Sequence, residues 1–157
     1  MTSRKVLFVL SPAFAGLLIA CAASPPPPTV VELVVHADDD INPDLTGRPS
    51  PIIVRYYQLA ATTAFEKADY FQIHDKEAAR LGRDLLDRQD LPLTPGATQT
   101  VSFEAKPGMK SLGIIASYRD IDKAVWRADL LLPAQQKVKL KVQLDKLGLS
   151  ITPDKKK

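Results

Sequence analysis

The amino-acid sequence predicts a mainly β domain, an antiparallel sandwich of short strands with an added helical element. Three observations predict it. Apolar and polar residues alternate in several short segments, as they do in strands with one buried face. Turn signals such as Thr94-Pro95-Gly96 and Pro107-Gly108 recur between these segments. One stretch beyond residue 62 shows apolar residues at helical spacing instead. Short strands separated by such turns are typical of sandwiches.

The strands are predicted from alternation and composition. The clearest is residues 138–144, where valine and leucine alternate with lysine and glutamine. Residues 52–59 are rich in β-branched and aromatic side chains, which favour strands. Residues 112–118 form a nearly continuous apolar run, which indicates a central strand. The other predicted strands are residues 31–35, 100–105, 124–132 and 149–151.

The helical element is predicted between the second and third of these strands. Thr63 and Glu66 have the spacing of a capping box, so a helix is expected to begin at Thr63. A second helix is expected around residues 76–88, although Gly82 interrupts its apolar repeat. A strand near Leu85 is the alternative for that segment.

The N-terminus has the layout of a secretory signal. Arg4 and Lys5 precede an uncharged apolar run over residues 6–20, which is shorter than the roughly 20 residues that a membrane helix needs. The run ends in Leu18-Ile19-Ala20-Cys21, and Cys21 is the chain's only cysteine. This string resembles the lipobox of bacterial lipoproteins. The alternative is ordinary cleavage beside Cys21, which would release a soluble periplasmic protein.

The lipobox resemblance implies that residues 1–20 are removed and that Cys21 carries the lipid anchor. Several acyl chains on one residue give stable anchoring, because each buried methylene contributes about 0.8 kcal/mol. Ala22 and Ala23 follow where an inner-membrane lipoprotein usually has aspartate, which implies an outer-membrane protein facing the periplasm. Residues 21–28 then form a proline-rich spacer, residues 29–152 the sandwich domain and residues 153–157 a basic tail.

The charge balance gives no indication of a nucleic-acid partner. The leader carries two of the 21 basic residues and none of the 18 acidic ones, so the mature chain is close to neutral. No nucleophile motif or phosphate-binding glycine loop is present, so we expect no enzymatic activity, catalytic residue, cofactor or small-molecule substrate. Tyr56, Tyr57 and Trp126 could line a ligand platform, but in strands such side chains more often pack in the core.

One pattern resembles a calcium loop without meeting its requirements. Oxygen-bearing side chains stand at every second position from Asp38 to Asp44, but Pro43 and Pro49 occupy the positions that need glycine and glutamate. The two histidines, His36 and His74, have no cysteine partner and no ligand spacing. We therefore expect a solvated acidic loop and no metal site.

The best candidate for a working surface is the connection between the first two predicted strands. It runs from Ala37 to Ser50, fourteen residues, whereas hairpin loops usually have about 2–5. Long connections of this kind are commonly functional.

Several short strings along the chain are not explained by strand patterns alone. Their order and spacing from the lipobox to the lysine-rich end resemble the outer-membrane lipoprotein of type VI secretion systems, the TssJ (SciN) family. The strings are Ile41-Asn42-Pro43-Asp44, Gly47-Arg48-Pro49-Ser50-Pro51, Val54-Arg55-x-Tyr57-Gln58-Leu59, Phe65-x-x-Ala68-Asp69-Tyr70-Phe71, Leu81-Gly82-x-Asp84-Leu85-Leu86, Leu93-x-Pro95-Gly96, Gly113-Ile114-Ile115-Ala116-Ser117-Tyr118-Arg119-Asp120 and Trp126-Arg127.

This resemblance implies a transthyretin-like β-sandwich with a structural role. The family binds the periplasmic domain of the inner-membrane protein TssM, with TssL in the wider complex, largely through the loop between the first two strands. The residues that this implies as partner-binding are Asp38, Asp39, Asp40, Ile41, Asn42, Pro43, Asp44, Leu45, Thr46, Gly47 and Arg48. A transthyretin-like lipoprotein that binds a small ligand or sugar is the alternative, and a concave aromatic pocket would favour it.

Overall fold

The computed structural model describes residues 27–154, so the predicted leader, Cys21 and the lysine tail lie outside the described residues. In chain order the elements are β1 (Val30–Ala37), β2 (Ile52–Leu59), α1 (Thr63–Lys67), α2 (Tyr70–Leu81), the 3₁₀ turn η1 (Gly82–Asp84), β3 (Leu85–Leu93), β4 (Thr98–Glu104), β5 (Ser111–Ala116), β6 (Arg127–Leu131), β7 (Lys137–Asp145) and β8 (Gly148–Pro153). Every predicted strand is present, with ends that differ by a few residues. Within the described residues no helix is long and apolar enough to cross a membrane.

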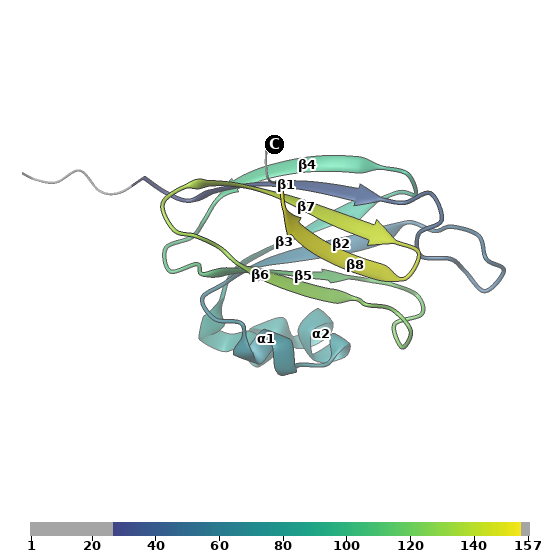
Figure 1. The fold of residues 1–157 in the computed structure, drawn as a ribbon. Helices are drawn as coiled ribbons and strands as arrows, with labels where there is room; N and C mark the ends of the chain where they lie inside the picture. Colours follow the sequence, from purple (N-terminus) through teal and green to yellow (C-terminus); the bar gives the residue numbers. More distant parts are fainter. Residues whose placement is uncertain (1–26, 155–157) are drawn as a thin grey trace, which may run out of the picture.

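The strands form a sandwich of two four-stranded sheets, in the orders β4-β1-β7-β8 and β3-β2-β5-β6. Figure 1 shows the two sheets stacked, with α1 and α2 beneath the second one. The predicted β-sandwich with an added helical element is therefore confirmed. One pair departs from the antiparallel expectation, because β1 and β7 run parallel from Val30↔Lys137 onward. No hairpin joins these two strands, so their direction is not fixed by a tight turn.

The core lies between the sheets and follows the predicted alternation. Val31, Leu33 and Val35 on β1 are fully buried, and they pack in one cluster with Val54, Ile114 and other inward residues of the opposite sheet. All six residues of β5 are buried, as the continuous apolar run predicts for a central strand. Its outer face is covered by the helices: Ile115 packs in a second cluster that includes Phe65 and Ile73.

The two helices differ in their N-terminal caps, and the capping box is found at α2 rather than at its predicted place in α1. Helix α1 begins at Thr63, as predicted; its N-cap is Thr62, without a side-chain bond, so the predicted Thr63–Glu66 box is wrong. The box lies at α2 instead, where the Asp69 carboxylate accepts from the Gln72 N–H at 2.8 Å. The Gln72 side chain in turn accepts from the Asp69 N–H at 3.3 Å.

A second helix is present, but not with the predicted bounds of residues 76–88: α2 covers only residues 76–81 of that range, and the alternative strand near Leu85 is confirmed. Helix α2 ends at Leu81 because Gly82 adopts a positive φ of 52°, which breaks the helical path. Strand β3 then begins at Leu85. Its apolar pattern is weak because it is an edge strand: residues 88–90 are exposed, and Pro92 is tolerated there.

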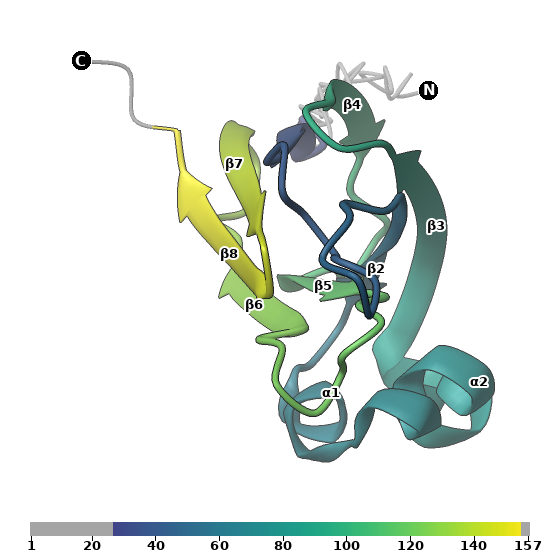
Figure 2. The same cartoon turned by 90° about the vertical axis from the view of Figure 1, so that its right-hand side faces the viewer.

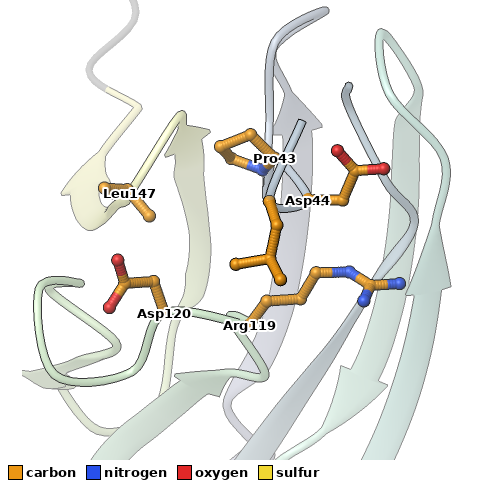
Figure 3. A pocket seen from close by; sticks show the side chains of 6 residues that line it. Pro43, Asp44, Arg119, Asp120 and Leu147 are labelled. Carbon is orange, nitrogen blue, oxygen red and sulfur yellow. The ribbon is translucent and has the colours of Figure 1, made fainter. Parts of the chain in front are cut away.

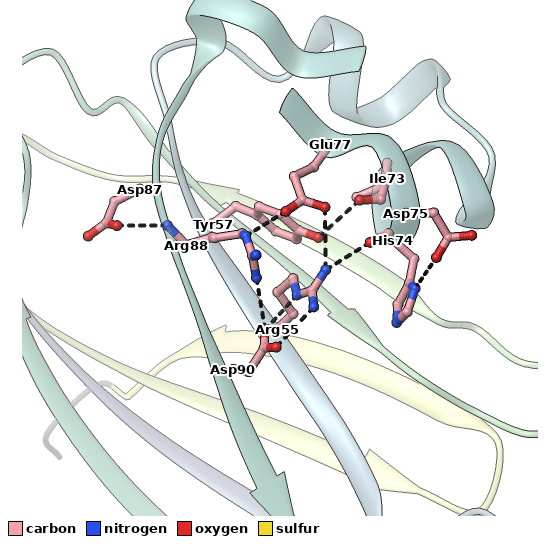
Figure 4. Close-up of polar contacts among 9 residues, drawn as sticks. All are labelled: Arg55, Tyr57, Ile73, His74, Asp75, Glu77, Asp87, Arg88 and Asp90. Atoms are coloured by element: carbon pink, nitrogen blue, oxygen red, sulfur yellow. Dashed lines mark hydrogen bonds and ion pairs between the residues drawn. The ribbon is translucent and has the colours of Figure 1, made fainter. Parts of the chain in front are cut away.

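A polar network binds α2 to the edge of the second sheet (Figure 4). The Arg55 guanidinium on β2 meets the Asp90 carboxylate on β3 through two contacts, of 2.5 Å and 2.9 Å. It also donates to the His74 carbonyl on α2 at 2.9 Å. Glu77 contacts Arg88 at 2.5 Å and Arg55 at 3.4 Å. Because Arg55 is 12% exposed, this network is part of the fold rather than a solvated surface.

Candidate functional site

The loop between β1 and β2 projects from one end of the sandwich, and Figure 2 views that end directly. Three other connections meet it there. Gly96 of the β3–β4 turn donates its N–H to the Asp38 carbonyl at 3.2 Å, and Asn42 donates its N–H to Lys146 of the β7–β8 turn at 3.1 Å. The Arg119 N–H of the β5–β6 loop reaches the Asn42 side chain at 2.8 Å. The predicted loop is therefore the centre of a surface built from four connections.

The base of the loop is anchored by two buried residues. Ile41 is fully buried and Asn42 is 2% exposed. The Asn42 side-chain amide donates to the Pro51 carbonyl at 2.8 Å while its oxygen accepts from Arg119. Asn42 has a positive φ of 49°, a conformation that asparagine adopts more readily than most residues. These two side chains hold the loop and are not available to a partner.

The tip of the loop is held by one carboxylate. Asp44 accepts from the Thr46 N–H at 2.8 Å and the Thr46 hydroxyl at 2.7 Å. It also accepts from the Arg48 N–H at 3.0 Å and the Arg48 Nε at 2.9 Å. The Thr46 hydroxyl and the Arg48 N–H are the largest causes that lower the pKa of Asp44 to about 2. A loop expected to be long and solvated is thus folded around an ionised aspartate.

Residues 45–49 are exposed at the tip, and Leu45 is exposed completely. Beside Leu45 lies a cavity of about 560 Å³ lined by Pro43, Asp44, Leu45, Arg119, Asp120 and Leu147. Figure 3 shows Leu147 and Asp120 on one side of it, and Asp44 with the Arg119 guanidinium on the other. Arg119, Asp120 and Leu147 were not predicted as site residues, because only the fold brings the β5–β6 and β7–β8 connections to this loop.

The acidic start of the loop does not gather its oxygens around one point. Asp38 accepts from the Gln143 side chain at 2.6 Å and faces His36 at 3.4 Å. Asn42 and Asp44 are used in the contacts described above, and Asp39 and Asp40 are exposed. Among residues 27–154 no group of three metal-type side chains could hold an ion. The predicted aromatic residues form no open platform: Tyr56 and Tyr57 are buried in the core, and Trp126 is half-buried and packs against both core clusters.

Comparison with known proteins identifies the chain's relatives. Residues 29–147 match the family described as type VI secretion lipoprotein, which includes VasD, EvfM and TssJ. The lipoprotein TssJ1 of the type VI secretion system of Pseudomonas aeruginosa is 34% identical, with a TM-score of 0.80 over 83% of this chain and 100% of that one. Lip of Serratia marcescens, a membrane-bound component of the type VI secretion system, is 28% identical, with a TM-score of 0.74 over 83% and 99%.

Two further solved structures contain a similar chain. One is titled as the type VI membrane complex, with 26% identity and a TM-score of 0.69 over 79% of this chain and 98% of that one. The other is titled as the C-terminal domain of the type VI protein TssM from EAEC, with 26% identity and a TM-score of 0.63 over the same shares. No curated protein sequence matches significantly. The family match covers most of the described fold, and the chain belongs to the type VI secretion lipoprotein family.

Proposed function

We propose that this protein is anchored to the outer membrane through a lipid on Cys21 and binds the periplasmic domain of TssM through its β1–β2 loop. It would thereby tether the outer-membrane end of a trans-envelope assembly. Membership of the type VI secretion lipoprotein family supports the lipid anchor. The similar chains in structures titled as the type VI membrane complex and a TssM domain support TssM as the partner.

The observation that carries this proposal is the tip of the β1–β2 loop. It presents a completely exposed leucine, Leu45, on a backbone that Asp44 already holds in place. Burying such a side chain against a partner removes apolar surface from water. Because the loop is already ordered, and Pro43 and Pro49 restrict it further, binding costs less conformational entropy. The proposed contact surface is therefore the exposed part of the predicted set: Asp39, Asp40, Leu45, Thr46, Gly47 and Arg48.

The direction of β1 supports the same arrangement. The spacer enters the strand at Val30 and the loop leaves it after Ala37. A strand of eight residues spans about 26 Å, so the loop and the anchored end of the domain lie at opposite ends of β1.

Binding of a small ligand or sugar has less support. The cavity beside the loop is lined by proline, leucine and charged side chains, and no aromatic ring is among its lining residues. Tyr56 is instead stacked on Phe103 with ring centroids 5.2 Å apart. Sugar sites depend on exposed aromatic faces, and the cavity beside the loop offers none. The exposed ring of Phe71 lines a smaller, separate pocket on α2.

The test is a pull-down of the TssM periplasmic domain by the full protein carrying Leu45→Asp. We expect the variant to fold normally and to lose binding, because a charge at the tip has to be desolvated in the interface. The matched control is Leu131→Asp, since Leu131 is 72% exposed at the far end of β6. Equal binding by wild type and Leu45→Asp would place the interface elsewhere.

A further inference from the structure

The cavity beside the loop tip has both an apolar and a charged side. Pro43, Leu45 and Leu147 provide apolar surface, and Arg119 and Asp120 come from the β5–β6 loop. Figure 3 shows the Arg119 guanidinium directed to the side where Asp44 lies, opposite Leu147. A volume of about 560 Å³ is ample for one or two side chains of a partner.

The walls of this cavity are fixed before any partner arrives. The Asn42 side chain holds the Arg119 backbone at 2.8 Å, and the Asn42 N–H holds the β7–β8 turn at the Lys146 carbonyl. The Tyr118 hydroxyl lies within hydrogen-bond distance of the Asp145 and Gly148 carbonyls on the same turn. Loop, β5–β6 connection and β7–β8 turn therefore form one pre-organised recess.

The charges around the recess are not balanced by the chain itself. Asp44 is paired with Arg48, whose Nη2 lies 2.9 Å from the carboxylate. Asp120 is paired with Lys123 at 2.8 Å. The Arg119 guanidinium has no ion pair or side-chain hydrogen bond with any described residue. Each of the two carboxylates at the recess is thus paired with a cation. The Arg119 guanidinium has no such partner among the described residues and can bind an anionic group of another protein.

We propose that this recess takes a partner segment in which an apolar side chain stands next to a carboxylate. The apolar side chain fills the space between Leu147 and Pro43, and the carboxylate forms a bidentate pair with Arg119. An arginine fork matches a carboxylate in geometry, and such pairs set register as well as affinity. The inference rests on the proposed function, since it defines the chemistry of the TssM segment that the loop surface recognises.

The test is the affinity of the full protein for the TssM periplasmic domain, measured by isothermal titration at low and high salt. We expect Arg119→Gln to lower affinity about tenfold or more and to reduce the salt dependence of binding. Leu147→Asp should abolish binding. Arg119→Lys should retain part of the affinity, because it keeps the charge but loses the fork. The matched control is Lys123→Gln, which removes a nearby cation that is already paired with Asp120.

The variants separate this inference from the proposed function. If Leu45→Asp abolishes binding while Arg119→Gln and Leu147→Asp bind like wild type, the recess proposal fails and the loop function stands. If Leu147→Asp abolishes binding but Arg119→Gln changes neither affinity nor salt dependence, the segment has no carboxylate at this place and the proposal is wrong. Self-association of the wild type that Leu147→Asp abolishes would show a second copy as the occupant. No binding by the wild type would overturn both proposals.

Discussion

The side-chain oxygen of Asn42 accepts the backbone N–H of Arg119 at 2.8 Å, across 77 residues of sequence. Through this bond and its other contacts, one buried amide joins the β1–β2 loop to the β5–β6 loop and to Pro51. The shape of the exposed tip therefore depends on a residue that a partner does not touch.

Asn42→Ala is expected to destabilise the protein by about 2 kcal/mol, because the Arg119 N–H and the Pro51 carbonyl lose their hydrogen-bond partner in a partly buried place. Urea unfolding of the full protein measures this loss. Asp40→Ala is the control, since Asp40 is exposed, and a change within about 0.5 kcal/mol is expected. Equal stability of Asn42→Ala and wild type would show that the amide does not hold the loop.

The loop is expected to keep its structure in mild acid. Hydrogen bonds from Thr46 and Arg48 lower the pKa of Asp44 from its ordinary value of 3.8 to about 2. A lowered pKa stabilises the folded loop above the ordinary value, and that contribution is lost progressively as the pH falls from about 3.8 through about 2. The titration of the Asp44 carboxyl carbon by NMR should therefore have its midpoint near pH 2. A midpoint near pH 4 would contradict the hydrogen-bonded loop.

Arg55→Met is expected to destabilise the protein by about 3 kcal/mol. The substitution keeps much of the side-chain volume but removes the bidentate partner of Asp90 and the donor to the His74 carbonyl. Only Arg88 then remains beside Glu77, which is 13% exposed. Thermal and urea unfolding would measure the effect. Arg48→Met is a control for stability, because Arg48 is 80% exposed in its ion pair and the change should be small.

Gly113→Ala is expected to cost about 1–3 kcal/mol through overpacking. A Cβ at this position would lie 2.9 Å from both Leu59 Cδ1 and Phe65 Cζ, where β5 packs against α1. When it is combined with Phe65→Leu, the free energy of unfolding should fall by less than the sum of the two single losses, because the smaller side chain makes room for the added methyl group. If the double variant is less stable than the sum of the two single effects, close packing at this point is not the cause.

Much of the sandwich is predictable from the sequence because its strands bury one face against one core. Val138 to Leu144 and Ile52 to Leu59 show this directly, and both were predicted nearly to the residue. Strand β3 was predicted only as an alternative, because residues 88–90 face solvent and carry no apolar alternation. The parallel β1–β7 pair was not predictable, since pairing between distant strands leaves no local pattern.

The candidate site was predictable only in part. Loop length and the family resemblance indicated the region from Asp38 to Arg48. Composition did not show that Asp44 folds the tip, because an acidic residue in a long loop is usually solvated. The recess was missed because Arg119 and Leu147 reach the loop through tertiary contacts, which the sequence does not display.

The most direct test of the whole account is co-sedimentation of the TssM periplasmic domain with outer-membrane vesicles that carry this protein. The account predicts that wild type brings TssM into the pellet. With Cys21→Ser, both proteins should remain together in the supernatant, and with Leu45→Asp the lipoprotein should pellet without TssM. Recovery of Cys21→Ser in the vesicle pellet would contradict the lipid anchor, and recovery of TssM with Leu45→Asp would contradict the loop as its binding site.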